Sequence, residues 1–205
     1  MIPLPQITRQ GQPIVKKKDE TQRKIIETFL SLYAKLPLKQ ITIKGITERL
    51  KINRGTFYLH YFDLDDLLTS IEDEHLEFIR KINDKNRRYY LSNKVNDLQK
   101  FYIPTLKHIE ENKPVIRILM SPNSRPRFKD AFKDMMRNNV KSKYQFALDG
   151  NKRDEYKKYI IDIIIAGNMG IISNWVCTEN NNSAQDIADL FGDILLNLPY
   201  FNVRS

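Results

Sequence analysis

The chain has 205 residues, a mass of 24.3 kDa and a single cysteine, Cys177. One cysteine excludes an intrachain disulfide and any zinc site that uses two or more cysteines. Only 7 Gly and 9 Pro occur, fewer than strand-and-turn architectures need, so we expect an all-α protein. The most apolar stretch, residues 159–172, contains Asp162 and Asn168 and is too short to span a bilayer. Because the opening residues also lack an apolar signal core, we expect a soluble cytoplasmic protein with no membrane partner.

The net charge of +9 is concentrated in the first third of the chain. Residues 1–64 carry 12 Lys and Arg against 5 Asp and Glu, whereas residues 65–205 carry 22 against 20. A basic segment before a nearly neutral body indicates nucleic-acid binding, with a basic tail that has no partner as the alternative. Residues 1–18, which end in Lys16–Lys18, are expected to be a flexible basic arm that follows a DNA backbone, or simply a frayed terminus.

Residues 19–64 have the pattern of a three-helix domain. Apolar residues recur at helical spacing over residues 21–36, and Pro37 ends this predicted helix. Thr42 is a suitable cap for a second short helix, and Asn53 for a third. Two short helices joined by a tight turn are typical of a helix-turn-helix, in which the second helix enters the major groove of DNA.

The third helix begins with small and polar side chains, as close approach to base edges requires. Arg54 can bond to guanine or to a phosphate, Gly55 lets the backbone approach, and Thr56 can contact a phosphate or a thymine methyl group. Phe57 and Tyr61 are expected to pin the helix to the core. The alternative is a helical hairpin with a solvated basic face. The predicted DNA-binding residues are Thr42, Lys44, Asn53, Arg54, Gly55, Thr56, Tyr58 and His60.

The run from Gly55 to Tyr61, followed by Asp65-Asp66-Leu67-Leu68, resembles the signature of the TetR-type bacterial transcriptional regulators. The resemblance covers about residues 20–70. It implies a helix-turn-helix head and a helical ligand-binding and dimerisation domain. Two positions depart from the family pattern: Lys51 stands in the turn where glycine is usual, and Leu64 stands where a phosphate-binding lysine is usual.

Residues 65–205 are expected to form the regulatory and dimerisation domain. A helix over 65–82 and a polar loop over 83–93 precede five further helices, near residues 97–112, 114–120, 126–148, 153–178 and 183–198. Pro104 is expected to kink or split the first of these five. The resemblance implies that the last two helices pair with those of a second chain to form a homodimer.

A ligand pocket is predicted from aromatic and sulfur side chains of this domain, which on residue type alone are as typical of a plain core. The candidates are Phe101, His108, Met120, Phe132 and Trp175. Glu72 and His75 form an isolated ExxH pair among acidic residues, and we expect them on the solvated surface. Phosphate-loop, GxSxG and HExxH motifs are absent, so we expect no enzyme activity, no metal and no cofactor.

The sequence therefore predicts a homodimeric DNA-binding transcriptional regulator that recognises a palindromic operator in double-stranded DNA. The resemblance favours a repressor released by a small-molecule effector. The alternative is an activator or adaptor of the same fold whose second domain binds a protein partner. That alternative predicts an exposed apolar groove and no enclosed pocket.

Overall fold

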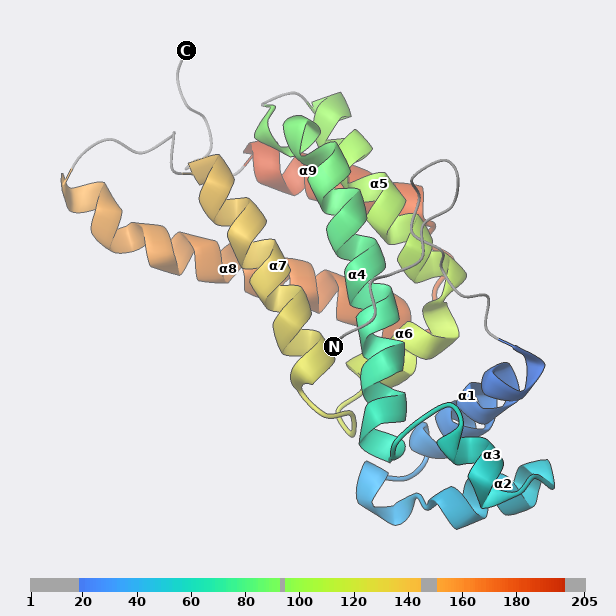
Figure 1. Cartoon of the computed structure of the whole chain (residues 1–205). Helices are drawn as coiled ribbons and strands as arrows, with labels where there is room; N and C mark the ends of the chain where they lie inside the picture. Colours follow the sequence, from blue (N-terminus) through green and yellow to red (C-terminus); the bar gives the residue numbers. More distant parts are fainter. Residues whose placement is uncertain (1–18, 93–94, 145–150, 198–205) are drawn as a thin grey trace, which may run out of the picture.

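The computed structural model describes residues 19–92, 95–144 and 151–197, and every regular element within these ranges is helical (Figure 1). The prediction of an all-α protein is therefore confirmed. The predicted basic arm over residues 1–18 lies outside the described residues. In chain order the elements are α1 (Glu20–Tyr33), the 3-10 helix η1 (Leu38–Gln40), α2 (Ile43–Leu50), α3 (Arg54–Tyr58), α4 (Leu64–Leu91), α5 (Val95–Glu111), α6 (Lys113–Met120), α7 (Arg127–Tyr144), α8 (Asn151–Cys177) and α9 (Ala184–Asn197).

Helices α1, α2 and α3 form a head at one end of the molecule (Figure 1). Thr42 Oγ1 accepts a hydrogen bond from the Gly45 N–H at 3.0 Å, and Asn53 Oδ1 accepts one from the Gly55 N–H at 2.9 Å. Both predicted caps are confirmed, because each side chain satisfies a backbone donor of a first helical turn. Lys51 ends α2 in the left-handed conformation, with φ 53° and ψ 42°. This residue supplies the tight turn that a glycine would otherwise make.

Helix α4 runs from the head into the body, which we define as α5–α9 (Figure 1). Asp63 begins α4 by accepting a hydrogen bond from the Asp66 N–H at 2.7 Å. The prediction of a loop over 83–93 is wrong, because α4 continues to Leu91. Tyr90 is fully buried and its ring centre lies 4.6 Å from that of Phe101, so tertiary packing holds this polar stretch in the helix.

The body is a bundle in which α5 packs against both α4 and α9, while α7 packs against α4 and α8 (Figure 1). Helix α5 continues through Pro104, so the split that the sequence led us to expect as one possibility does not occur. Ser183 and Asp186 form a capping pair at the start of α9: the Ser183 N–H donates to Asp186 Oδ2 at 2.7 Å, and the Asp186 N–H donates to Ser183 Oγ at 3.2 Å.

The apolar part of α8 is longer than the sequence pattern indicated. Residues 158–177 are long and apolar enough to cross a membrane by length and composition alone. The inner side of this segment is buried in the chain, at Ile161, Ile164, Ile165 and Ile172. About 39% of this segment is buried in the chain, and a core helix can have the same length and composition, so the segment alone does not indicate a membrane anchor.

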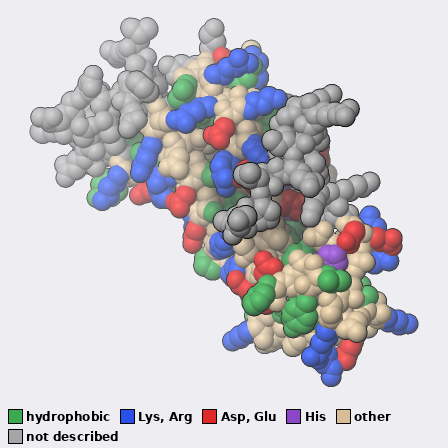
Figure 2. All heavy atoms as spheres, viewed as in Figure 1, with side chains coloured by type: hydrophobic (Ala, Val, Ile, Leu, Met, Phe, Trp, Pro, Cys, Tyr) green, Lys and Arg blue, Asp and Glu red, His purple; other side chains and the backbone are tan. Residues whose placement is uncertain are grey.

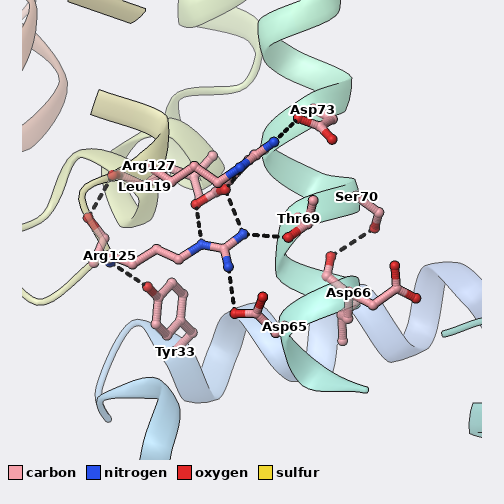
Figure 3. A network of polar contacts seen from close by, with 12 residues as sticks. Tyr33, Asp65, Asp66, Thr69, Ser70, Asp73, Leu119, Arg125 and Arg127 are labelled. Carbon is pink, nitrogen blue, oxygen red and sulfur yellow. Dashed lines mark hydrogen bonds and ion pairs between the residues drawn. The ribbon is translucent and has the colours of Figure 1, made fainter. Parts of the chain in front are cut away.

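An arginine in the α6–α7 connection ties the body to α4 and α1 (Figure 3). Arg125 donates to both carboxylate oxygens of Glu72 at 2.9 and 2.7 Å, to Asp65 at 2.6 Å and to Thr69 at 2.7 Å. Its backbone N–H donates to the Tyr33 hydroxyl at 2.9 Å. We call this set the arginine clamp, since one residue of the body holds two helices at the head end.

Glu72 is fully buried in the arginine clamp, so its predicted place on the solvated surface is wrong. Arg127 adds a second cation, donating to Glu72 at 2.8 Å and to Asp73 at 2.6 Å. Hydrogen bonding to Glu72 raises the pKa of Arg125 above its usual value. A buried carboxylate is stable only when such partners compensate the loss of water.

Candidate nucleic-acid interface and ligand cavity

Helix α3 has a buried side and a fully exposed side. Phe57 and Tyr61 are buried against the rest of the head, which confirms the prediction that they pin the helix. Arg54, Gly55 and Tyr58 are exposed, and Thr56 is half-buried at the edge. The helix is therefore held by two aromatic side chains and presents its predicted base-reading residues to solvent.

The head also carries cations that no carboxylate neutralises. Arg54, Lys51, Arg49, Lys39 and Lys35 make no ion pair within the described residues. In Figure 2, Lys and Arg side chains lie around exposed hydrophobic ones on the head. Free guanidinium and ammonium groups beside an exposed helix suit contact with phosphates on either side of a groove.

The remaining predicted residues lie at the flanks of this surface. Thr42 is exposed at the start of α2, and Lys44 is exposed with its Nζ 3.7 Å from Glu48, a solvated pair that a phosphate can displace. Asn53 caps α3 through Oδ1 and is itself exposed. His60 is turned toward the head, with Nδ1 3.9 Å from Asp19 Oδ2 and only 15% of its side chain exposed.

A substitution at Gly55 can weaken DNA binding without lowering the stability of the fold. A methyl group added there would meet only Asn53 Oδ1, at an ordinary contact distance of 3.6 Å. We therefore expect Gly55→Ala to keep or raise the free energy of unfolding, by up to about 1 kcal/mol, since alanine favours helix over glycine. The same methyl group would hold α3 away from a base edge. Titration of labelled duplex should then show at least a several-fold loss of affinity in a protein whose denaturation midpoint has not fallen. An unaltered affinity would mean that this face does not approach DNA.

One cavity of the described residues lies between α4 and the body and is partly open to solvent, with a volume of about 40 Å³. Phe101 and Phe132, both predicted pocket residues, line it together with other apolar side chains. Every lining residue is uncharged. The polar groups of the lining, which sequence reasoning did not single out as a set, come from Asn83, Tyr90, Tyr102, Thr105, Asn139 and Asn168.

Tyr102 and Asn168 give this cavity its hydrogen-bonding character. Burial raises the pKa of the Tyr102 hydroxyl well above its usual value, an effect that the nearby Tyr90 and Asn168 side chains offset only in part. The group therefore stays neutral at physiological pH and serves as a hydroxyl donor or acceptor. At about 40 Å³, the cavity holds a few water molecules and is much smaller than the roughly 300–1,000 Å³ of most ligand pockets.

The other three predicted pocket residues lie outside this lining. Trp175 is buried at the end of α8, where its Nε1–H donates to the Asn182 carbonyl at 2.8 Å and Lys113 Nζ lies 5.0 Å from the ring centre. Met120 is buried at the end of α6. His108 is buried between α4 and α5, with Nε2 3.0 Å from His75 Nδ1 and its ring stacked on Phe78 at 3.9 Å. These three side chains therefore pack within the fold and do not line the cavity.

The His75–His108 pair predicts a loss of stability in acid. Burial lowers the pKa of His108, an effect that Glu111 and Glu74 partly oppose. Below about pH 6.5 the unfolded chain therefore binds more protons at this position than the folded chain, and the free energy of unfolding falls as the pH falls. His108→Gln removes this proton site, so its urea denaturation at pH 7.5, 6.5 and 5.5 should show a shallower decline than the wild type. Parallel declines would contradict the assignment.

Helix α8 also carries an exposed face with few charges, which we call the α8 face; the exposed Asp162, ion-paired with Arg137, lies at its edge. The α8 face consists of Tyr159, Ile163, Ala166, Gly167, Gly170 and Asn174. Ile163 is 67% exposed. No other atom lies within 4 Å of the point where a side chain would begin at Gly167 or Gly170, so another helix can approach closely there. Helix α9 has two exposed apolar side chains of its own, Leu190 and Ile194. Such a face is suited to burial against another protein surface.

A short helix braced by two others, a left-handed turn at Lys51 and an exposed polar helix start together define the helix-turn-helix transcriptional regulators. Comparisons with known proteins agree with this class and also indicate the family. Residues 96–197 match the TetR-type family model described as a transcriptional regulator C-terminal region. The helix-turn-helix regulator YxbF of Bacillus subtilis (strain 168) is 24% identical over 122 residues. That match covers 60% of this chain, and the chain spans only 31% of the length of YxbF.

Solved structures share the fold over most of the chain. The fatty acid degradation regulator FadR of Bacillus halodurans superposes with a TM-score of 0.59 at 16% identity, covering 89% of this chain and 97% of FadR. A TetR/AcrR-family regulator of Aquifex aeolicus VF5 gives 0.60 at 17% identity, covering 85% and 97%. The dihydroxyacetone kinase operon activator DhaS gives 0.53 at 22% identity, covering 86% and 94%.

The chain thus belongs to the TetR family of transcriptional regulators. The matched proteins are described as regulators and not as enzymes. Within the described residues, no group of three or more His, Cys, Asp or Glu side chains is placed to hold a metal ion.

Proposed function

We propose that the chain is a cytoplasmic, sequence-specific DNA-binding regulator that reads a palindromic operator as a homodimer. The observation that carries the proposal is the exposed side of α3, where Arg54 and Gly55 stand free beside unpaired cations of the head. In this reading Arg54 contacts a guanine edge or a phosphate, and Thr42, Lys44, Asn53 and Tyr58 fix the register through phosphates.

The α8 face supports the homodimer. One head covers only one half-site, and two-fold DNA sites are read by two heads about one helical turn apart, or a multiple of it. A self-complementary contact through α8 and α9 would bury the exposed Ile163 and the open surface over Gly167 and Gly170.

Release of DNA by a small-molecule effector is the regulatory mechanism that we propose. The cavity draws its lining from α4, α5, α7, α8 and α9, and α4 leads directly from it to the head. A ligand that enlarges the cavity would displace α4, and the arginine clamp would pass this displacement to α1 through Tyr33. DNA affinity would fall by the difference in the effector's affinity for the two states, which describes a repressor.

The small cavity volume favours a second candidate. A cavity of about 40 Å³ is too small for a typical effector without rearrangement. The structure of DhaS, an operon activator, has a similar fold. In the second candidate the body binds a protein partner, and DNA binding leads to activation. Thermal denaturation with candidate metabolites, compared with co-purification of partners, separates the two mechanisms.

Arg54→Ala tests the DNA-reading role directly. Arg54 is exposed and unpaired, so the substitution should leave the denaturation midpoint unchanged. We expect binding to the preferred duplex to weaken by about 1–3 kcal/mol, with relaxed preference at one position of each half-site. Fluorescence anisotropy over a panel of single-base variants measures both quantities. An Arg54→Ala protein with wild-type affinity and preference would remove Arg54 from the interface.

A further inference from the structure

Leu59 is exposed at an unusual place. It follows α3 directly, with helical φ and ψ of −68° and −21°, and 82% of its surface is exposed. A lone exposed leucine needs no explanation on most protein surfaces. This one, however, lies four residues after Gly55, and residues spaced by four share one face of a helix. Leu59 therefore stands one turn beyond the glycine at which α3 is free to approach DNA.

The buried side of α3 confirms this orientation. Phe57 and Tyr61, also four residues apart, are both buried against the head. At 100° per residue, Leu59 lies about 160–200° around the helix from these two side chains, so it points directly away from the core. Tyr58 and Thr56 lie to either side of it. Leu59 thus occupies the centre of the outward face of the reading helix.

An aliphatic side chain at this place has a restricted choice of partners. Guanine, adenine and cytosine present hydrogen-bonding groups in the major groove, and covering them with leucine would leave those groups without water or a partner. Thymine alone presents a methyl group there. Burial of this methyl group against leucine removes apolar surface from water on both partners.

From this geometry we propose that Leu59 is a specificity-determining residue that reads the 5-methyl group of a thymine in each half-site. The inference rests on the proposed DNA-binding function and extends it. Arg54 at the start of α3 and Lys51 in the turn before it are exposed and make no ion pair within the described residues, so the head that carries Leu59 offers positive charge to a polyanion. Phe62, which is 83% exposed, lies beyond the end of α3, so it serves as a control for an exposed apolar side chain of the head.

Replacing thymine by deoxyuridine removes only the methyl group, and this isolates the contact. The full chain is first used to select duplexes from a random library. Each thymine of the best duplex is then replaced singly by deoxyuridine, and affinity is measured by anisotropy. For the wild type we expect one position per half-site to lose about 3–10-fold in affinity, the range set by burial of one methyl group. For Leu59→Ala we expect a loss below about 2-fold at that position.

Two control variants assign the effect to Leu59. Phe62→Ala should keep the deoxyuridine effect. Thr56→Ser keeps the hydroxyl and removes the methyl group of the other candidate for a thymine contact, and it should keep the effect too. Unchanged denaturation midpoints establish that each variant is folded. The proposal is overturned if the wild type is indifferent to every deoxyuridine, or if the Leu59→Ala protein remains equally sensitive. If no duplex is retained at all, the proposed DNA-binding function fails as well, so the two failures are distinguishable.

Discussion

Arg125→Met should lower the free energy of unfolding by about 3 kcal/mol, the largest effect that we expect from a single substitution in this chain. Glu72 is fully buried, and Arg125 donates to both of its oxygens. Removing one partner of a buried ion pair leaves a charge without compensation, at a cost of about 3–5 kcal/mol. Arg127 still donates to Glu72 at 2.8 Å, so the lower end of this range applies.

Chemical denaturation measures this loss of stability, and two further variants serve as controls. Arg80→Met removes an arginine of a solvated surface pair with Glu77 and should cost below about 1 kcal/mol. Adding Glu72→Gln to Arg125→Met removes the orphaned charge and should restore part of the stability. If Arg125→Met is no more costly than Arg80→Met, the arginine clamp contributes nothing to the joint between head and body.

Ile163→Arg should dissociate the proposed homodimer into monomers. Ile163 is 67% exposed in the single chain, so an arginine there does not disturb the fold of one chain. In a two-fold interface it would place two unpaired cations in apolar surroundings. We expect the dimer dissociation constant to rise on the order of 100-fold, equivalent to about 2.7 kcal/mol. Affinity for a two-half-site duplex should fall with it.

Sedimentation velocity over a concentration series reads this equilibrium directly. Leu91→Arg is the matched control, because Leu91 is also an exposed apolar residue and lies at the end of α4 instead of on α8. It should leave the mass of the particle unchanged. A dimer that survives Ile163→Arg with its original dissociation constant would exclude the α8 face as the interface.

The head could be predicted closely because its signals are local. The caps at Thr42 and Asn53 act over two or three residues, and the lengths of α2 and α3 follow from them. Lys51 stands where the family pattern has glycine, and its left-handed conformation takes the place of that glycine in the turn. Neighbouring side chains in sequence were sufficient to place the exposed start of α3.

Predictions for the rest of the chain failed where contacts join residues that are distant in sequence. Glu72 and His75 stand among acidic neighbours and gave no local sign of burial, because their partners Arg125 and His108 lie 53 and 33 residues away. Residues 83–91 have a polar composition, and only the packing of Tyr90 shows why they are helical. The cavity residues were predicted from residue type alone, and residue type does not distinguish Phe101, which lines the cavity, from Trp175, which lies in the core.

Selection of genomic fragments by the purified full chain at physiological salt is the most direct test of the central claim, that α3 reads DNA as one half of a symmetric pair. Sequencing the retained fragments should reveal a two-fold site whose half-sites lie about one helical turn apart, or a multiple of it. The same selection with Arg54→Ala should relax one position in each half. Retention without any enriched sequence, or loss of all binding at this salt concentration, would contradict the account.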